Sequence, residues 1–318
     1  MSTDPSDGPL ADRLLATWRD QAEDGFLLSS TDPSAVEILE APDPISGVLF
    51  RFRWMPHREI RADIEELERR GIVNPDRDEA KLFADPRDPR GRYCFLCPDN
   101  IRETNPLERL VPLRLAERDY LAGANFAWIA ANHFTVLAAE HVDQDFTEHT
   151  LDAMVDLHRQ TGGRFRVLYN GAGAGATIPW HLHYQLTTEP FPVEGLASEE
   201  TYPTPVTRLL LVPNRLDAAR EIVEDWTARD PDNHRVNLLI SGSVVSPQLH
   251  VFARDRRRTH AVEKGLVGGF EVCGDFVYSE PPMREWFDRA SAGLARRILA
   301  EVRPPSVPEK RSQGRGLP

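Results

Sequence analysis

The sequence predicts an α+β fold in which helices flank an antiparallel sheet. Short segments with the two-residue alternation of a strand follow one another along the chain, and longer segments with helical spacing lie between them. Strands and helices do not alternate in the regular order that a parallel sheet requires. With 318 residues, the chain is long enough for one large domain or two small ones. We expect a single domain over residues 10–302, with disordered tails at 1–9 and 303–318 that are rich in Pro, Ser, Gly and charge.

The first half of the domain carries the stronger periodic signals. Apolar side chains recur at helical spacing over residues 10–21 and alternate with other residues over 48–54, which predicts a helix and then a half-buried strand. The Asp-, Arg- and Pro-rich stretch at 76–92 is typical of a surface loop. Further strands are predicted at 126–130, 134–139, 165–169 and 181–188, and a helix at 144–160.

The second half shows a similar order of elements with weaker signals. Strands are predicted at 208–212, 236–240 and 249–253, and helices at 216–227 and 283–302. The similarity leaves open a degenerate two-half repeat. Its motif-bearing half would cover about 48–195 and its second half about 196–302.

Composition and charge restrict the classes of function. The net charge of −12 argues against a broad nucleic-acid surface, because phosphate backbones select for basic footprints. No apolar run approaches the ~18 to 20 residues that span a bilayer, and residues 1–9 lack the basic and apolar regions of a secretory signal. Three cysteines are too few for a disulfide framework. We therefore expect a cytoplasmic protein that binds neither nucleic acid nor membranes.

The segment from Asn170 to Gln185 carries the most informative pattern, Asn-Gly-Ala-Gly-Ala-Gly-Ala-Thr-Ile-Pro-Trp-His-Leu-His-Tyr-Gln. Side chains two residues apart on a strand point to the same side, so His181, His183 and Gln185 are expected to share one face. The glycines let the backbone approach a ligand closely, and N–H groups of such a loop can hold phosphate oxygens. A glycine-rich run alone is more often a plain loop, and two histidines alone are more often incidental. Their direct succession, ending in glutamine, favours a site for chemistry at phosphorus.

This segment resembles the nucleotidyltransferase branch of the histidine-triad superfamily. The branch includes galactose-1-phosphate uridylyltransferases, diadenosine tetraphosphate phosphorylases and GDP-hexose phosphorylases. Residues 176–185 and the following Pro190-Phe-Pro-Val-Glu194 are most similar to the GDP-hexose phosphorylases. The Cys94-Phe-Leu-Cys97 pair and the span 126–144, with Glu140-His141, are more similar to the uridylyltransferases. The resemblance covers about residues 48–195, including a looser match at 50–58.

The resemblance implies a histidine-triad-like fold and a ping-pong nucleotidyl transfer through a covalent intermediate on His183. Gln185 would donate a hydrogen bond to a phosphate oxygen as charge develops there. The residues implied in nucleotide and phosphate binding are Asn170, Gly173, Gly175, Ala176 and Thr177. The implied substrate is a nucleotide sugar or another nucleoside diphosphate derivative, with phosphate or a sugar phosphate as acceptor, and a homodimer is compatible with this function.

Two other functions stay open. One is a dinucleoside polyphosphate phosphorylase or a nucleotidyl hydrolase, and the other is a non-enzymatic nucleotide- or metal-binding protein. Small hydrolases of the superfamily have a third histidine where Gln185 stands, so the glutamine favours transfer over hydrolysis. Leu182 and Tyr184 depart from the uridylyltransferase pattern, which argues against a strict UDP-hexose substrate.

Cys94 and Cys97 have the C-x-x-C spacing that chelates one metal ion. The resemblance to the uridylyltransferases supplies His141 and His181 as the other ligands of a structural zinc, with His133 as a substitute for His141. The GDP-hexose phosphorylase pattern gives no support for zinc, and a reduced cysteine pair packed without metal is the alternative. We expect zinc because the cysteine pair is present.

Two basic clusters are secondary candidates for contacts with phosphate. The densest contains Arg254, Arg256, Arg257 and Arg258. Its position after a predicted strand favours a solvated loop over a phosphate clamp. The second, on or near the early strand, contains Arg51, Arg53 and Arg58.

Overall fold

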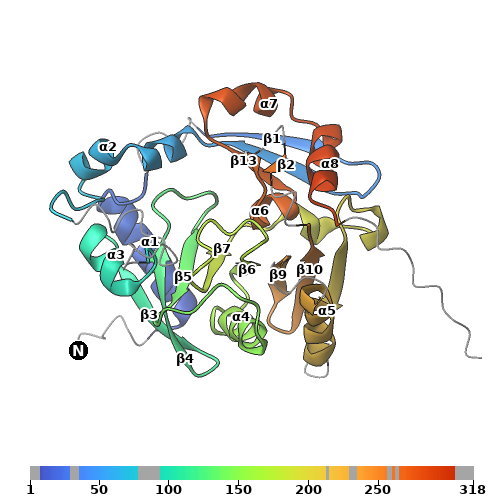
Figure 1. The fold of residues 1–318 in the computed structure, drawn as a ribbon, viewed down its shortest axis with the longest axis horizontal. Helices are drawn as coiled ribbons and strands as arrows, with labels where there is room; N and C mark the ends of the chain where they lie inside the picture. The colour runs from blue at the N-terminus through green and yellow to red at the C-terminus, as the bar shows by residue number, and fades with distance from the viewer. Residues whose placement is uncertain are drawn as a thin grey trace, which may run out of the picture.

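The computed structural model describes residues 8–28, 36–77, 94–212, 215–228, 235–255, 260–261 and 265–304. Its main element is an eight-stranded antiparallel sheet in the order β3-β4-β5-β7-β6-β9-β10-β8 (Figure 1). In chain order the strands are β3 (Leu110–Leu115), β4 (Arg118–Ala124), β5 (Phe134–Ala138), β6 (Arg166–Asn170), β7 (His183–Thr187), β8 (Val206–Leu210), β9 (Val236–Ser243) and β10 (Ser246–Ala253). The predicted α+β fold with an antiparallel sheet and flanking helices is confirmed.

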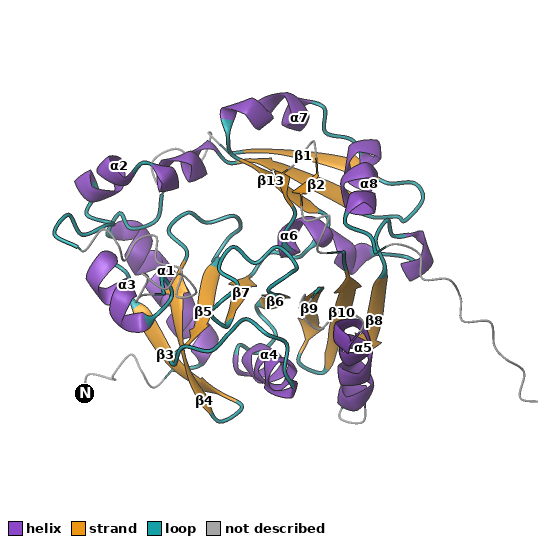
Figure 2. Ribbon diagram, viewed as in Figure 1, coloured by secondary structure: helices purple, strands orange, loops and turns teal. Residues whose placement is uncertain are grey.

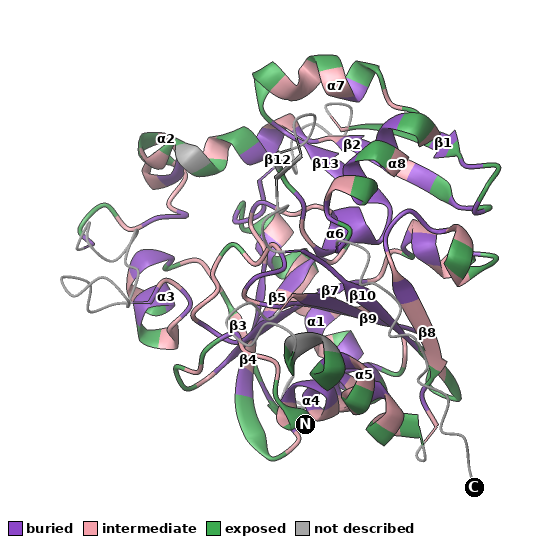
Figure 3. Ribbon diagram, turned by 45° about the vertical axis from the view of Figure 1, so that its right-hand side comes forward, coloured by how far each residue is buried: buried purple, intermediate pink, exposed green. Residues whose placement is uncertain are grey.

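Three amphipathic helices cover one face of the large sheet. They are α1 (Leu10–Glu23), α4 (Glu148–Gln160) and α5 (Leu216–Ala228). Their apolar side chains join the largest core cluster, where Leu14 of α1 and Leu157 of α4 are buried together with Tyr184 of β7. Figure 3 shows that the central strands β7, β9 and β10 are themselves largely buried. This face is therefore closed by packing, and any site on the sheet lies on the other face.

The other face of the large sheet is partly covered by a second sheet and several short helices (Figure 2). In this second sheet β1 (Glu37–Pro42) pairs antiparallel with β2 (Leu49–Trp54), and β13 (Asp275–Tyr278) pairs parallel with β2. The rings of Phe52 and Phe276 stack with centroids 5.0 Å apart, in a cluster that also contains Leu168 and Leu239 of the large sheet. The remaining described elements are η3 (Pro56–Ala62), α2 (Ile64–Arg69), α3 (Pro98–Thr104), η5 (Pro192–Gly195), η6 (Glu199–Thr201), β11 (His260–Ala261), β12 (Gly265–Leu266), α6 (Gly269–Val272), η9 (Pro281–Met283), α7 (Arg284–Asp288) and α8 (Ala292–Glu301).

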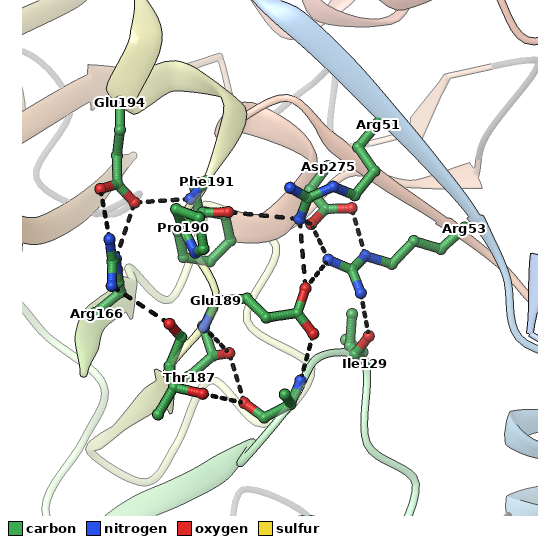
Figure 4. A network of polar contacts seen from close by, with 12 residues as sticks. Arg51, Arg53, Ile129, Arg166, Thr187, Glu189, Pro190, Phe191, Glu194 and Asp275 are labelled. Carbon is green, nitrogen blue, oxygen red and sulfur yellow. Dashed lines mark hydrogen bonds and ion pairs between the residues drawn. The ribbon is translucent and has the colours of Figure 1, made fainter. Parts of the chain in front are cut away.

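A partly buried ionic network connects the second sheet to the end of β7 (Figure 4). The guanidinium of Arg53 on β2 donates from Nε to Oδ1 of Asp275 at 2.7 Å and from Nη2 to Oε2 of Glu189 at 2.6 Å. The other oxygen of Glu189 accepts the N–H of Ala131 at 2.6 Å, and Arg51 reaches Asp275 at 3.1 Å. Because both acids and both arginines are paired with one another, this cluster holds the two sheets together.

The strand register places one row of side chains across the open face of the large sheet. Gly123 of β4 lies opposite Thr135 of β5, which lies opposite Gln185 of β7, which lies opposite Leu168 of β6. Residues directly opposite in antiparallel strands project from the same face. In the neighbouring row, Leu137 of β5 lies opposite His183.

Most of the predicted elements are present with shifted ends. The predicted helix at 144–160 begins four residues later, as α4, and the predicted strand at 181–188 is β7, which begins at His183. His181 therefore precedes the strand, and the expectation that it shares a strand face with His183 and Gln185 is wrong for His181. Strands β1, β3, β4 and β13 and helices α2 and α3 were not predicted. Within the described ranges, no helix is both long and apolar enough to cross a membrane.

Two predicted elements are wrong. Residues 126–130 form no strand, because the chain bends back after β4. In this bend the N–H of Asn125 donates to the carbonyl of His133, and the N–H of Ile129 donates to the ring Nδ1 of His133. The helix predicted at 283–302 is divided into α7 and α8, since Ser291 caps a new helix by accepting the N–H of Leu294. Residues 1–7 and 305–318 of the predicted tails, and residues 78–92 of the predicted loop, lie outside the described residues.

Candidate active site

His183 is the first residue of β7 and is almost fully buried on the open face of the sheet. Its Nδ1 lies 2.8 Å from the carbonyl oxygen of His181, so Nδ1 carries the proton and donates it to that oxygen. Burial lowers the pKa of the His183 imidazole, which keeps the ring neutral at pH 7. Within the described part of the chain the one hydrogen bond of the ring is that of Nδ1, so Nε2 has no partner there. The ring therefore presents a neutral nitrogen lone pair, which is what a nucleophilic histidine needs.

The backbone of His183 is held on both sides by one buried side chain, Gln144. The Gln144 Oε1 atom accepts the N–H of His183 at 2.7 Å, and its Nε2 donates to the carbonyl of His183 at 3.0 Å. The same Nε2 donates to the carbonyl of Asn170 at 2.8 Å, at the end of β6. Gln144 thus joins the start of β7 to the start of the glycine-rich loop. The sequence predicted it as the first residue of a helix and missed this function, which no local pattern indicates.

A cavity of about 410 Å³ lies between the large sheet and the layer of short helices. Gln185 lines it from β7, whereas His183, which begins the same strand, is not among the lining residues. Three of the five predicted nucleotide-binding residues, Asn170, Gly175 and Thr177, also line this cavity. Gly173 and Ala176 do not line it. The catalytic and nucleotide-binding roles of all these residues remain predictions.

Buried polar contacts hold the glycine-rich loop above the end of β6. The carbonyl of Ala174 accepts hydrogen bonds from Nη1 of Arg254 at 2.7 Å and from Nδ2 of Asn237 at 2.9 Å. Asn237 also donates to Oδ1 of Asn170 at 2.7 Å. Gly175 has a φ of +84°, and a Cβ there would lie 2.4 Å from the carbonyl oxygen of Val267. A side chain is therefore excluded where the loop passes along the cavity.

Four residues that could ligate one metal ion lie together beside His183. The ligand atoms of Cys94, Cys97, His141 and His181 all lie within 4.8 Å of one another. Nδ1 of His181 is 3.4 Å from Sγ of Cys94, and Nδ1 of His141 is 3.4 Å from Sγ of Cys97. Tetrahedral zinc with ordinary Zn–S and Zn–N bonds separates sulfur and nitrogen ligands by about 3.5 Å. The predicted set of four residues is thus brought together by the fold, and it fits a metal ion of this size.

The chemistry of the four side chains also fits a metal. The Nε2–H group of His181 donates to the carbonyl of Ala138 at 2.9 Å, which leaves the Nδ1 lone pair for the cluster. Burial lowers the pKa of His181 to about 4, so its imidazole is neutral, and raises the pKa of the Cys94 thiol to about 12. A bound cation would reverse the latter shift. His133 lines the cavity and is not among the four residues, so His141 is favoured over this substitute.

The arginines of the two basic clusters have different positions. Arg51 and Arg53 are committed to the ionic network with Asp275 and Glu189, so they do not reach the cavity. Arg58 lines the cavity, and its buried Nη1 has no partner among the described residues. Burial, with the nearby Arg61, lowers the pKa of Arg58 to about 9.

Arg254 is buried beneath the glycine-rich loop, which overturns the interpretation of a solvated position. Its Nε and Nη2 atoms have no partner among the described residues. The other members of its cluster, Arg256, Arg257 and Arg258, lie outside the described residues.

Comparisons with known proteins place the chain by its fold. A family described as a domain of unknown function (DUF4922) matches residues 55–188, and no curated protein matches the chain. The crystal structure of yeast Ap4A phosphorylase Apa2 in complex with AMP is similar, with a TM-score of 0.60 and 14% identity, over 98% of this chain and 100% of that one. The structure of that enzyme with Ap4A covers 93% of this chain and 97% of its own, with a TM-score of 0.58 and 13% identity. A third structure of the same enzyme has 15% identity and a TM-score of 0.58, over 93% and 94% of the two chains. The chain therefore shares the α+β fold of this yeast phosphorylase over nearly its whole length.

Proposed function

We propose that the chain is a nucleotidyltransferase that breaks a phosphoanhydride of a nucleotide through a covalent nucleotidyl-His183 intermediate. The observation that carries the proposal is the His183 ring itself. Its Nδ1–H is held by the carbonyl of His181 at 2.8 Å, its pKa is lowered by burial, and its Nε2 makes no hydrogen bond among the described residues. Gln185 on the same strand face lines a cavity large enough for a nucleotide.

The proposed reaction has two displacement steps at the α-phosphorus. In the first, the Nε2 lone pair of His183 forms a P–N bond while the P–O bond to the leaving group breaks. In the second, an oxygen of the acceptor forms a new P–O bond, the P–N bond breaks, and neutral imidazole returns. The amide of Gln185 would donate to a non-bridging oxygen during both steps. Because the Nδ1–H group of His183 stays hydrogen-bonded to the His181 carbonyl, the ring keeps one orientation throughout.

Arginines in the lining of the cavity suit an anionic leaving group or acceptor. Arg58 and Arg61 both line it, and Arg58 is a buried cation with an unpartnered Nη1 in the described residues. Glu271 also lines the cavity and accepts the N–H of Gly268 at 2.8 Å. A phosphate group between the two arginines would supply the acceptor oxygens that Arg58 lacks.

For the substrate, we propose a dinucleoside polyphosphate first and a nucleotide sugar second. The likeness in fold to a phosphorylase that has been crystallised with AMP and with Ap4A supports the first, over nearly the whole chain. The local pattern at residues 176–194 supports the second. Both are nucleoside diphosphate derivatives with an anionic leaving group, and phosphate or a sugar phosphate would be the acceptor.

We further propose that Cys94, Cys97, His141 and His181 hold a structural zinc. Four protein ligands would leave no open position for water, so the ion would stabilise the segment before β7 and take no part in the displacement. The residues that act on the nucleotide are separate from the metal ligands, although the carbonyl of His181 accepts the Nδ1–H hydrogen bond that orients His183.

The test is intact-mass spectrometry of the protein after incubation with dinucleoside tetraphosphates or with nucleoside diphosphate sugars, without acceptor. One added nucleoside monophosphate is expected on the natural chain and none on His183→Ala. His149→Ala is the matched control, because His149 lies on α4 and bonds Tyr120 at 2.9 Å, and it should keep the adduct. An adduct on His183→Ala would refute the proposal, and an adduct from sugars alone would select the second substrate. No adduct from any substrate would favour a non-enzymatic nucleotide-binding protein.

A further inference from the structure

A small side cavity of about 70 Å³ adjoins the main cavity. The two share Phe95, Asn125 and Phe126 in their linings. The other residues that line the side cavity are Leu96, Ile101, Asn105, Glu108, Ala124, Thr135 and Leu137. It is thus a mostly apolar recess that shares two aromatic side chains with the main cavity and has one carboxyl group in its lining. The proposed function assigns nothing to it.

The side cavity lies one to two strands away from the proposed nucleophile, on the same face of the sheet. Leu137, which lines it, lies opposite His183, and Thr135 lies opposite Gln185. Gly123 on β4 is the next residue of that row. Two strand spacings amount to about 10 Å. That distance is comparable with the reach from the α-phosphorus of a nucleotide to the far edge of its base.

The Glu108 carboxyl group can lie against the sheet because Gly123 has no side chain. A Cβ on Gly123 would lie 2.0 Å from Oε1 of Glu108, so any other residue there would displace the carboxyl group. Oε2 of Glu108 accepts a hydrogen bond from Nδ2 of Asn105 at 3.2 Å. Within the described ranges, Asn105 is the polar partner of the Glu108 carboxyl group, and no arginine or lysine forms an ion pair with it. Burial raises the pKa of Glu108 to about 7, which shows how poorly the site solvates the ionised carboxyl group.

A carboxylate in such a recess favours a ligand edge with two adjacent N–H donors. Guanine has this edge in its N1–H and N2 amino groups, which match two carboxylate oxygens. Adenine has one amino group next to a ring nitrogen that accepts, and this nitrogen would face a carboxylate oxygen unfavourably. The rings of Phe95 and Phe126, which line both cavities, offer apolar surface for the rest of the base.

We propose that Glu108, positioned by Asn105 and Gly123, reads the base of the transferred nucleotide in this recess, and that the base is guanine. The inference rests on the proposed function, because it places the α-phosphate of the same nucleotide at His183. The edge of the base enters the side cavity, while its remainder and the ribose lie in the main cavity.

The test is isothermal titration calorimetry of GMP, IMP and AMP at pH 8, where Glu108 is ionised. The natural chain should bind GMP on the order of ten- to a hundredfold more tightly than AMP, as one bidentate pair allows. IMP, which keeps N1–H and lacks the N2 amino group, should fall between them. Glu108→Gln should lose this preference through weaker GMP binding, since its amide offers one donor and one acceptor. Glu221→Gln, an exposed control on α5 across the sheet, should bind all three as the natural chain does.

Equal binding of GMP and AMP by the natural chain, tighter binding of AMP, or an unchanged preference in Glu108→Gln would each overturn the assignment. Circular dichroism of Glu108→Gln shows whether the variant is folded. A variant that is unfolded leaves the comparison of the three nucleotides on the natural chain as the deciding result. The proposed function has a separate readout. A His183 adduct with no base preference refutes only the guanine assignment. A GMP preference without any adduct refutes only the proposed nucleotidyltransferase activity.

Discussion

Replacement of Gln144 by alanine should weaken both the fold and the proposed nucleophile. The Gln144 side chain is fully buried and makes three hydrogen bonds, one from the N–H of His183 and two to the carbonyls of His183 and Asn170. Each net hydrogen bond contributes about 1 kcal/mol, and a buried group left without a partner costs about 1 to 3 kcal/mol. We therefore expect Gln144→Ala to lower the free energy of unfolding by about 2 to 5 kcal/mol. Urea denaturation followed by tryptophan fluorescence measures this change.

The same variant should slow the formation of the His183 adduct. Without Gln144 the backbone at the start of β7 is free to shift, and a displacement of about 1 Å in a reacting group can cost roughly a hundredfold in rate. The rate is measured by intact mass at a temperature where the variant is folded. Gln160→Ala is the control, because Gln160 on α4 donates to the carbonyl of Arg114 at the surface. If Gln144→Ala loses no more stability than this control and forms the adduct at the natural rate, Gln144 does not position the nucleophile.

Four further predictions test the site and its surroundings. His183→Ala should lose turnover by several orders of magnitude while staying folded, and free imidazole should restore part of it to His183→Gly, as measured by phosphorolysis or transfer assays. Gln185→Ala should slow both half-reactions by roughly 10²- to 10³-fold with little change in unfolding; unchanged rate constants for both would remove it from the reaction. Elemental analysis should find one zinc per chain, and Cys94→Ser should lose the metal and be less stable; a full zinc content in that variant would exclude the four-residue site. Because the pKa of Glu108 is raised in the folded state, its stabilising contribution is complete below pH ~4.5 and is lost as the pH rises to about 7. The free energy of unfolding of Glu108→Gln should therefore rise by about 1 to 3 kcal/mol relative to that of the natural chain between pH 4.5 and 8. Parallel pH profiles of unfolding for the two proteins would contradict this.

The sequence predicted the parts of the fold whose signals are local. Helical or two-residue periodicity revealed α1, α4, β2, β5 and β7. Residues 126–130 have a strand-like composition, yet they form a closed bend, because contacts of Asn125 and Ile129 with His133 determine their conformation. The strands β3 and β4 were missed, although β4 supplies the glycine against which Glu108 packs. Tertiary contacts, which no short window of sequence contains, decide such segments.

The same distinction applies to the candidate site. The four metal-ligating candidates are separated by as many as 87 residues, between Cys94 and His181, and only the resemblance to a known family joined them. Gln144, Arg61 and Glu108 carried no signal, because a single polar residue in a loop is common and its partners come from distant strands. Arg51 and Arg53 carried a signal of positive charge, but Asp275, more than 200 residues away, and Glu189 neutralise it together.

The ionic network of Figure 4 also decides which part of the chain can fold by itself. Residues 55–188, which match the family of unknown function, end before Glu189 and exclude Arg53 and Asp275. A fragment with these limits would also lack β9, so β6 would become an exposed edge strand next to the nucleophile strand. We expect this fragment to aggregate when it is expressed alone. The recognisable segment of this protein is therefore smaller than its folding unit, and studies of its chemistry need β2, β9 and β13 as well.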